Sequence, residues 1–188
     1  LNGCRKVFYC RGINTLLYAG TFKNEHVKLF KRFKDMGFDG VEIALEKKGD
    51  IDYKKTLEEL KKNDLKCCSI CGLFGPDRDL RSPKSEYVEG SKAYIRDCID
   101  ACVELECNLF VGPAYSSVGR AEQESEEDKK QQWKEVVKNF KEICKYAEAK
   151  GVYVAIEPLN RFETDFINIC DDAIRMIEDV GSEMLKIH

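Results

Sequence analysis

The sequence alternates from end to end between short apolar runs and longer amphipathic segments. The short runs have the length and composition of buried strands, and the longer segments repeat apolar residues at helical spacing. Strict alternation of strand and helix implies a parallel sheet. The expected strands are 12–18, 40–45, 65–72, 108–111, 152–157 and a sixth from 184, and the expected helices are 24–36, 53–63, 85–105, 126–150 and 171–180.

Two architectures fit a parallel α/β chain: an open doubly wound sheet and a closed barrel of eight β-α units. The glycine-rich GxGxxG motif of a dinucleotide-binding sheet is absent after the first expected strand. Barrel enzymes place their sites at the carboxyl ends of many strands. Polar and aromatic residues gather at those ends here, which favours a (β/α)8 TIM-type barrel; they are Tyr18, Glu42, Gly72, Tyr115 and Glu157.

The length bounds how much of such a barrel is present. The chain has 188 residues, whereas a complete barrel needs about 250. We therefore expect one domain, 1–188, that forms the N-terminal portion of a barrel with about six strands and five helices. The C-terminal part, roughly two and a half β-α units, is expected to be missing.

Composition excludes some partners. The chain carries 31 basic and 34 acidic residues, a net charge of -3, whereas a nucleic-acid partner would call for a basic face. No apolar run approaches the roughly 18 residues of a membrane span. These features predict a protein that binds neither nucleic acid nor membrane.

Ten cysteines are present, and most lie inside apolar runs, where a free cysteine behaves as a small hydrophobe. Disulfide scaffolds are usually short secreted chains, so we interpret these cysteines as reduced thiols of a cytoplasmic protein. Cys68 and Cys71 form a CxxC pair. Because no second pair of ligands completes a zinc site, we interpret both as structural.

The strongest local signal is the segment VYVAIEPLNRFE, residues 152–163. An apolar strand ends in Glu157 and is followed at once by Pro158, so we expect this carboxylate to point into the barrel mouth. A carboxylate there can bind a divalent metal ion or act as a general acid or base. The alternative is a strand-end glutamate paired with Arg161.

Several stretches resemble one family. IEPLNRFE resembles the fifth-strand motif of the D-tagatose and D-psicose (allulose) 3-epimerases, within the xylose-isomerase-like barrels. INTLLYAGTF and FDGVEIAL resemble that family's first two strands. Residues 78–120, which end in GPAYSSVGR, resemble its third-loop-to-fourth-strand region, and 165–188 continue the likeness. The resemblance covers nearly the whole chain.

The resemblance implies a metal-dependent epimerase of free ketoses, interconverting D-tagatose with D-sorbose or D-fructose with D-psicose. It implies a divalent ion, most often Mn²⁺ with Mg²⁺ or Co²⁺ as alternatives, and a homo-oligomer. Two glutamates would take and return the C3 proton, while the ion stabilises the enediolate. By motif, Glu157 is a catalytic residue and metal ligand, and Glu163 and Tyr18 contact the substrate.

The same resemblance places an aspartate ligand two residues after the position of His188, with a histidine ligand and the second glutamate later still. This chain alone is therefore expected to be inactive and to hold the ion weakly. The two substrate-contact candidates each have a structural alternative. Glu163 could be a loop carboxylate bonded to Arg161 or to a helix N-terminus, and Tyr18 could pack at the barrel mouth without touching the substrate. Glu42 can bond the substrate or a neighbouring strand, and we favour the structural bond; Cys71, Tyr115 and His188 are further candidates for the pocket.

Other functions stay open. Another sugar isomerase, a hydroxypyruvate isomerase-like enzyme or an inosose dehydratase would use similar chemistry. An abasic-site endonuclease would need several histidines, and the sequence has two. A catalytically incomplete fragment or a binding module is the alternative from another class.

Overall fold

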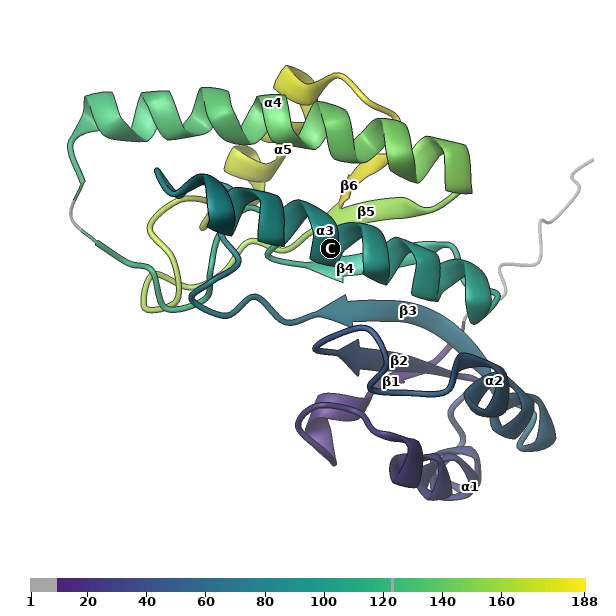
Figure 1. Cartoon of the computed structure of the whole chain (residues 1–188). Coiled ribbons are helices and arrows are strands. Elements are labelled where there is room, and N and C mark those ends of the chain that lie inside the picture. The colour runs from purple at the N-terminus through teal and green to yellow at the C-terminus, as the bar shows by residue number, and fades with distance from the viewer. Residues whose placement is uncertain (1–9, 123) are drawn as a thin grey trace, which may run out of the picture.

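The computed structural model describes residues 10–122 and 124–188. Six strands form one sheet in sequence order, and every neighbouring pair is parallel. They are β1 (Gly12–Asn14), β2 (Gly40–Leu45), β3 (Lys66–Gly72), β4 (Leu109–Gly112), β5 (Tyr153–Ile156) and β6 (Leu185–Ile187). Consecutive strands that lie side by side in parallel are the pattern of a barrel wall, as Figure 1 shows.

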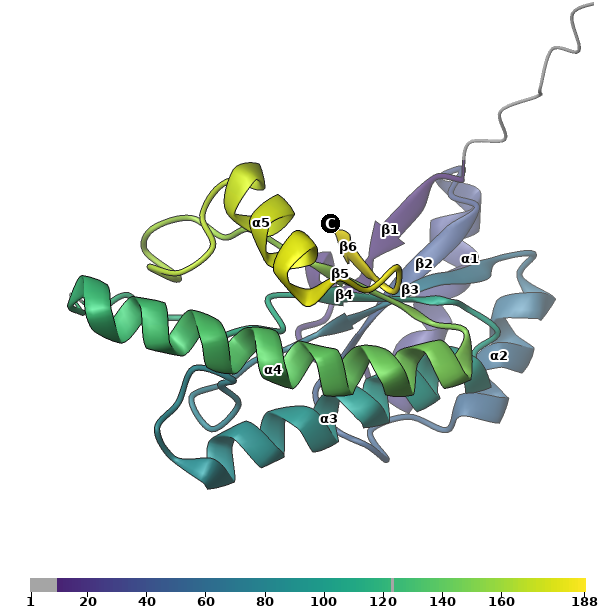
Figure 2. The same cartoon turned by 90° about the horizontal axis from the view of Figure 1, so that it is seen from above.

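Five α-helices connect the described strands and lie along the outside of the curved sheet (Figure 2). They are α1 (Leu29–Asp35), α2 (Tyr53–Lys62), α3 (Ser85–Glu104), α4 (Glu126–Lys150) and α5 (Cys170–Val180), with two 3₁₀ helices at Thr15–Leu17 and Asn24–Lys28. Six parallel strands and five α-helices confirm the predicted α/β fold. No helix of the described chain has the length and apolar character needed to span a membrane.

The two faces of the sheet differ in what covers them. Val41, Ile43 and Leu45 of β2 alternate with inward residues and belong to the main core beneath the helices. On the opposite face, Cys71, Val111 and Ala155 form a separate small apolar cluster at successive strands. This second cluster corresponds to the inside of a barrel, where residues from neighbouring strands pack in layers.

Two predicted elements differ from the structure. The expected strand 12–18 ends at Asn14, because the Asn14 side chain accepts a hydrogen bond from the Leu16 backbone N–H (2.8 Å) and turns the chain into a 3₁₀ helix. The expected helix 24–36 begins as a 3₁₀ helix and becomes an α-helix at Leu29. Elsewhere the predicted bounds agree with the structure to within one residue at each end.

The nine cysteines within the described residues are free thiols, and Cys4 lies outside those residues. Cys68 and Cys71 both lie on β3. Cys71 is buried and Cys68 partly so. Their position on an interior strand supports the structural interpretation of the CxxC pair.

Candidate functional site

A cavity of about 740 Å³ opens at the carboxyl ends of β3, β4 and β5. It is bounded by the loops that follow these strands, with one residue from the turn after β1 and one that follows β2. The carboxyl ends of the strands are where a parallel barrel gathers its functional side chains. The lining includes Leu16, Glu46, Cys71, Phe74, Asp77, Arg78, Pro113, Glu157, Leu159 and Glu163.

Glu157 is the first residue after β5 and is held through its backbone. Its N–H donates to the carbonyl of Gly112 at the end of β4 (3.2 Å), and its carbonyl accepts from the Tyr115 hydroxyl (2.8 Å). Within the described residues the Glu157 carboxylate accepts no hydrogen bond; it is 39% exposed at the cavity mouth, and its Oε2 lies 4.0 Å from Nδ1 of His188. Among the described residues Glu157 does not pair with Arg161, so the structural alternative for this carboxylate is not observed.

The buried Tyr115 holds the backbone of Glu157 in place. Its ring is completely buried, and its hydroxyl contacts the carbonyls of Glu157 (2.8 Å) and Ile167 (3.1 Å). Burial raises the pKa of the Tyr115 hydroxyl, so the group stays protonated and can donate. The sequence offers Tyr115 as a residue of the pocket lining; the structure instead places it beneath the site, where its hydroxyl joins the loops after β4 and β5.

Glu163 lies on the same cavity as Glu157. The Asn160 side-chain amide donates to its carboxylate, and its own carbonyl accepts from the Gly119 N–H (2.7 Å). The bond to Gly119 connects the two motif segments, 156–163 and GPAYSSVGR. The structure therefore brings together the two predicted carboxylates, with Asn160 rather than Arg161 as the partner of Glu163. The substrate contact itself stays a prediction.

Tyr18 lies elsewhere. Its ring packs edge-on against Phe33 at 5.0 Å between centroids, Arg32 lies over it at 5.1 Å, and its hydroxyl is 3.8 Å from the Met36 sulfur. These contacts place it against α1, and the cavity lining found in the described chain takes Leu16 from this segment rather than Tyr18. Its role in substrate binding stays a prediction.

Glu42 is held inside the sheet. Its two carboxylate oxygens accept from Asn14 Nδ2 (2.6 Å) on β1 and from the Ser69 hydroxyl (2.5 Å) on β3. A polar group in such a strand needs partners, and these two supply them, as the structural interpretation expects. Burial, together with the charges of Glu42 and Glu157, raises the pKa of the Cys71 thiol to about 12. Cys71 therefore lines the cavity as a neutral thiol.

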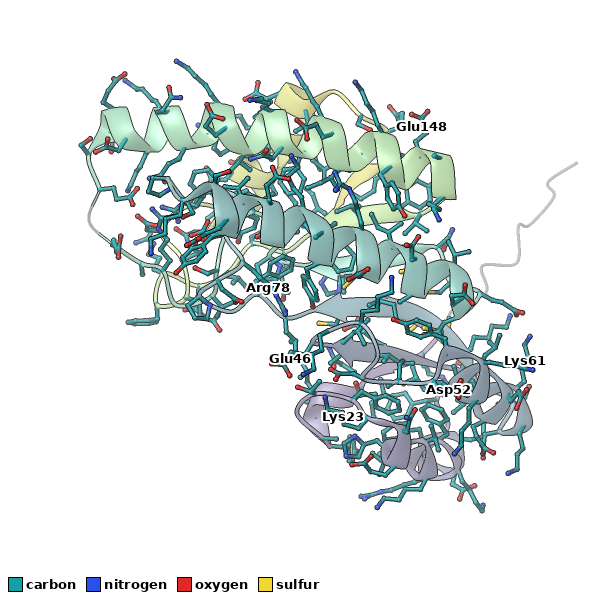
Figure 3. The ribbon with its side chains drawn as sticks, viewed as in Figure 1. Lys23, Glu46, Asp52, Lys61, Arg78 and Glu148 are labelled. Carbon is teal, nitrogen blue, oxygen red and sulfur yellow. The ribbon has the colours of Figure 1, made fainter. Side chains whose placement is uncertain are left out.

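Three charged residues of the cavity were not predicted from the sequence: Glu46, Asp77 and Arg78. Glu46 follows β2, and Arg78 lies in the loop after β3; Figure 3 shows both near the carboxyl end of β3. The Arg78 guanidinium donates to the Leu73 carbonyl (2.8 Å) and stacks on the Tyr94 ring at 3.9 Å. The sequence marks Arg78 only as a loop residue near Gly75 and Pro76, with no sign that the loop folds over the site.

A sequence model of the family described as "Xylose isomerase-like TIM barrel" matches residues 30–188. The chain belongs to this family. A D-psicose 3-epimerase from Ruminiclostridium cellulolyticum is 26% identical over 184 residues, which cover 94% of the chain and 60% of the relative. Another D-psicose 3-epimerase, from Enterocloster bolteae, is also 26% identical, with 94% and 61% covered.

Among solved structures, an L-ribulose 3-epimerase superposes with a TM-score of 0.86 at 21% identity, covering 95% of the chain and 59% of the other protein. At that identity the likeness establishes the fold. The chain spans about three-fifths of the length of the curated relatives it matches. These comparisons confirm the resemblance and the partial xylose isomerase-like barrel that the sequence predicted.

This barrel segment also contains a buried ion-pair network that the sequence did not reveal. The Arg81 side chain is completely buried and pairs with Asp165 (2.8 Å) and Glu124 (3.4 Å). Arg120 pairs with Asp79 (2.7 Å) and with Glu124 (2.6 Å). The partners come from the loops after β3, β4 and β5, so the network holds together the three loops that surround the cavity.

The donors present do not form a complete metal site. Within the described residues no group of three or more histidine, cysteine, aspartate or glutamate side chains is arranged to hold an ion. Glu157 offers carboxylate oxygens of the kind that Mn²⁺ and Mg²⁺ prefer, and the His188 imidazole lies 4.0 Å away at the end of β6. One carboxylate beside one imidazole fits part of a ligand set and not the whole of one.

Proposed function

We propose that the protein is a ketose 3-epimerase that acts on free ketohexoses, the D-tagatose/D-sorbose and D-fructose/D-psicose pairs. The observation that carries the proposal is the free carboxylate of Glu157, held at the cavity mouth by its backbone within the IEPLNRFE motif. Relatives named D-psicose 3-epimerase and ketose 3-epimerase support the reaction class.

The chemistry asked of Glu157 is proton transfer at C3 of the sugar. The proton on this carbon is acidic because the neighbouring C2 carbonyl accepts the charge as an enediolate. A carboxylate at the cavity mouth can remove that proton, and return of a proton on the opposite face inverts the centre. Glu163, on the same cavity, is proposed to bind a sugar hydroxyl.

The charge of the cavity favours a neutral sugar over a sugar phosphate. Four carboxylate side chains line it in the described chain, those of Glu46, Asp77, Glu157 and Glu163, against the single guanidinium of Arg78. That guanidinium already donates to a backbone carbonyl and stacks on Tyr94. A phosphate would meet net negative charge here, whereas hydroxyl groups would find acceptors.

The proposal includes dependence on a divalent ion, Mn²⁺ first and Mg²⁺ or Co²⁺ as alternatives. Such an ion would supply Lewis-acid stabilisation of the enediolate, with Glu157 as one of its ligands. The described residues form no complete ligand set, so further ligands are required. We propose a homo-oligomer of cytoplasmic location as the working form of the enzyme.

The test is an assay of both ketose pairs with and without added Mn²⁺, using the full-length gene product, its variant Glu157→Gln and a matched control. Glu148→Gln serves as the control because this glutamate is exposed near the end of α4, far from the cavity (Figure 3). Loss of a general base lowers kcat by about 10² to 10⁴, so Glu157→Gln should lose that much while Glu148→Gln keeps full activity.

Full activity of Glu157→Gln would refute the assigned role. Absence of epimerisation on both pairs with every metal by the full-length gene product would refute the reaction. Interconversion of an aldose and a ketose in the same assays would instead identify one of the related isomerases, which share the enediolate chemistry.

A further inference from the structure

The loop that follows β3 places one arginine on the wall of the candidate site. Arg78 lines the same cavity as Glu157 and Glu163, and it also borders a smaller neighbouring cavity of about 230 Å³. Figure 3 shows Arg78 and Glu46 at the carboxyl end of the sheet. The proton transfer proposed for this site uses Glu157 and Glu163 and leaves Arg78 without a role.

The guanidinium of Arg78 is held in a fixed position. Its Nη1 donates to the carbonyl of Leu73 (2.8 Å), and its central carbon lies over the Tyr94 ring, 3.9 Å from the ring centroid. Tyr94 is itself buried, and its hydroxyl accepts from the Leu73 N–H (2.7 Å) and donates to the Leu45 carbonyl. A group that is already ordered loses less conformational freedom when a ligand binds. Arg78 is therefore preorganised to bind a ligand in the cavity.

Most of the hydrogen-bonding capacity of Arg78 is unused. A guanidinium carries several N–H donors, and within the described residues one of its nitrogen atoms has an acceptor, the carbonyl of Leu73. In the same part of the chain Arg78 forms no ion pair, although Glu46 and Asp77 line the cavity with it. Donors on a fixed, partly buried side chain are thus left to face the cavity.

A hydroxyl group is the ligand that suits this wall. It accepts from a guanidinium N–H and donates its own proton to a carboxylate. Arg78 offers the donors, and Glu46 and Asp77 offer acceptors on the same cavity. The Thr21 hydroxyl donates to Oε2 of Glu46 (2.9 Å), which leaves Oε1 as an acceptor for the ligand. An anionic ligand group would instead meet the carboxylates that line this cavity.

The spacing of the strands indicates which sugar hydroxyl reaches Arg78. Glu157 follows β5 and Arg78 lies in the loop after β3, with β4 between these two strands. Neighbouring strands are about 4.8 Å apart, so the ends of β3 and β5 are separated by about 10 Å. A ketohexose with its C3 at Glu157 spans that gap only with one end of its carbon chain. The C6 end is the longer arm from C3, and it takes no part in the enediolate.

On the basis of the proposed ketose 3-epimerase function, we propose that Arg78 is a specificity-determining residue that binds the terminal C6 hydroxyl of the ketohexose. The contact is the same in the substrate and in the transition state, because no bond changes at C6. Uniform binding of this kind lowers KM and leaves kcat nearly unchanged. Arg78 thereby selects six-carbon ketoses that carry a free terminal hydroxyl.

The test is a cycle of two substrates and two enzymes. The values of kcat and KM are measured for D-fructose and 6-deoxy-D-fructose with Mn²⁺, using the full-length gene product and its variant Arg78→Met. A hydrogen bond to a charged group corresponds to a factor of roughly 10 to 100. The variant should therefore reduce the preference for D-fructose in kcat/KM by that factor, through KM. The two sugars differ in their open-chain fractions, and this difference cancels because both enzymes meet the same solutions.

Arg175→Met is the matched control. Arg175 also stacks on an aromatic ring, that of Trp133 at 3.9 Å, but it lines a different cavity. This variant should keep the preference of the unmodified enzyme. Arg78→Lys is the second variant if Arg78→Met does not fold by circular dichroism. It keeps the charge and loses the planar fork of donors, so it should lose part of the preference.

Equal losses on both sugars in a folded Arg78 variant would overturn the proposal, because a purely structural role produces that result. A fall in kcat with an unchanged KM would also overturn it. If the unmodified full-length product epimerises neither sugar, the proposed function fails and this inference fails with it. If that product epimerises both sugars and the Arg78 variants keep its preference, this inference alone is refuted.

Discussion

Tyr115→Phe isolates the hydroxyl that supports Glu157. The ring is completely buried, and its hydroxyl is 2.8 Å from the Glu157 carbonyl and 3.1 Å from the Ile167 carbonyl. Phenylalanine keeps the ring and removes one oxygen, so packing is preserved. The substitution therefore measures the bond that joins the two loops after β4 and β5.

The expected loss of stability has two sources: the hydrogen bond that the substitution removes and the carbonyl oxygen that it leaves without a donor. The hydroxyl has one proton, so the two carbonyls share one donor. Losing a neutral hydrogen bond costs about 0.5 to 1.5 kcal/mol, and leaving a buried acceptor unsatisfied costs about 1 to 3 kcal/mol. We expect the free energy of unfolding to fall by about 2 kcal/mol. For a protein of this size the midpoint of thermal unfolding should then fall by about 4 to 8 °C.

Urea denaturation followed by circular dichroism gives the free energy of unfolding, with Tyr153→Phe as the matched control. Tyr153 is 39% exposed at the start of β5, so its substitution should change stability by less than about 0.5 kcal/mol. Equal stabilities for Tyr115→Phe and the unmodified protein would refute the reasoning. They would mean that the two carbonyls find other donors or water once the hydroxyl is gone.

Two further predictions concern the sheet and the charged network. The substitution Gly72→Ala would place a Cβ 2.7 Å from Phe110 and 2.9 Å from Phe74, both buried rings. This overpacking should lower the free energy of unfolding by about 1 to 3 kcal/mol. The control Gly20→Ala, with open space around it, should be near neutral by the same urea titration. Burial alone would raise the pKa of Glu124, but hydrogen bonds from Arg120 and Gln132 lower it below 4.5. A carboxyl group whose pKa is lower in the folded state stabilises the protein at pH values above its unfolded-state pKa, and this stabilisation is lost as the pH falls. The urea midpoint should therefore be level from about pH 7 to 5 and drop below about pH 4.5. The variant Glu124→Gln should show a smaller drop, and an identical pH profile in that variant would contradict the assignment.

The sequence predicts the long helices well because their end signals are local. The bounds of α4 agree with the prediction: Ser125 caps its first turn by accepting from the Asp128 N–H (3.1 Å), and Gly151 ends it with a φ of 68°. The first strand was predicted too long because one side-chain bond, from the Leu16 N–H to Asn14, turns the chain sooner than its apolar pattern indicates.

The candidate site is predictable only in part for a related reason. Glu157 and Glu163 belong to one continuous motif, so their common location follows from sequence. The position of Arg78 over the cavity, and that of Tyr18 against α1, depend on how loops and helices pack in three dimensions. The network of Arg81 joins residues as far apart as Asp165, 84 positions along the chain, which no local pattern indicates.

That separation has a consequence for the order of folding. Arg81 and its partners Glu124 and Asp165 meet only after the β-α units between them have docked, because these residues lie in the loops after three different strands. Contacts of such long sequence separation tend to form late, after the transition state for folding. Interactions that are absent from the transition state slow unfolding rather than speed folding. We therefore expect the network around the cavity to slow unfolding of the assembled mouth and to leave the folding rate largely unchanged.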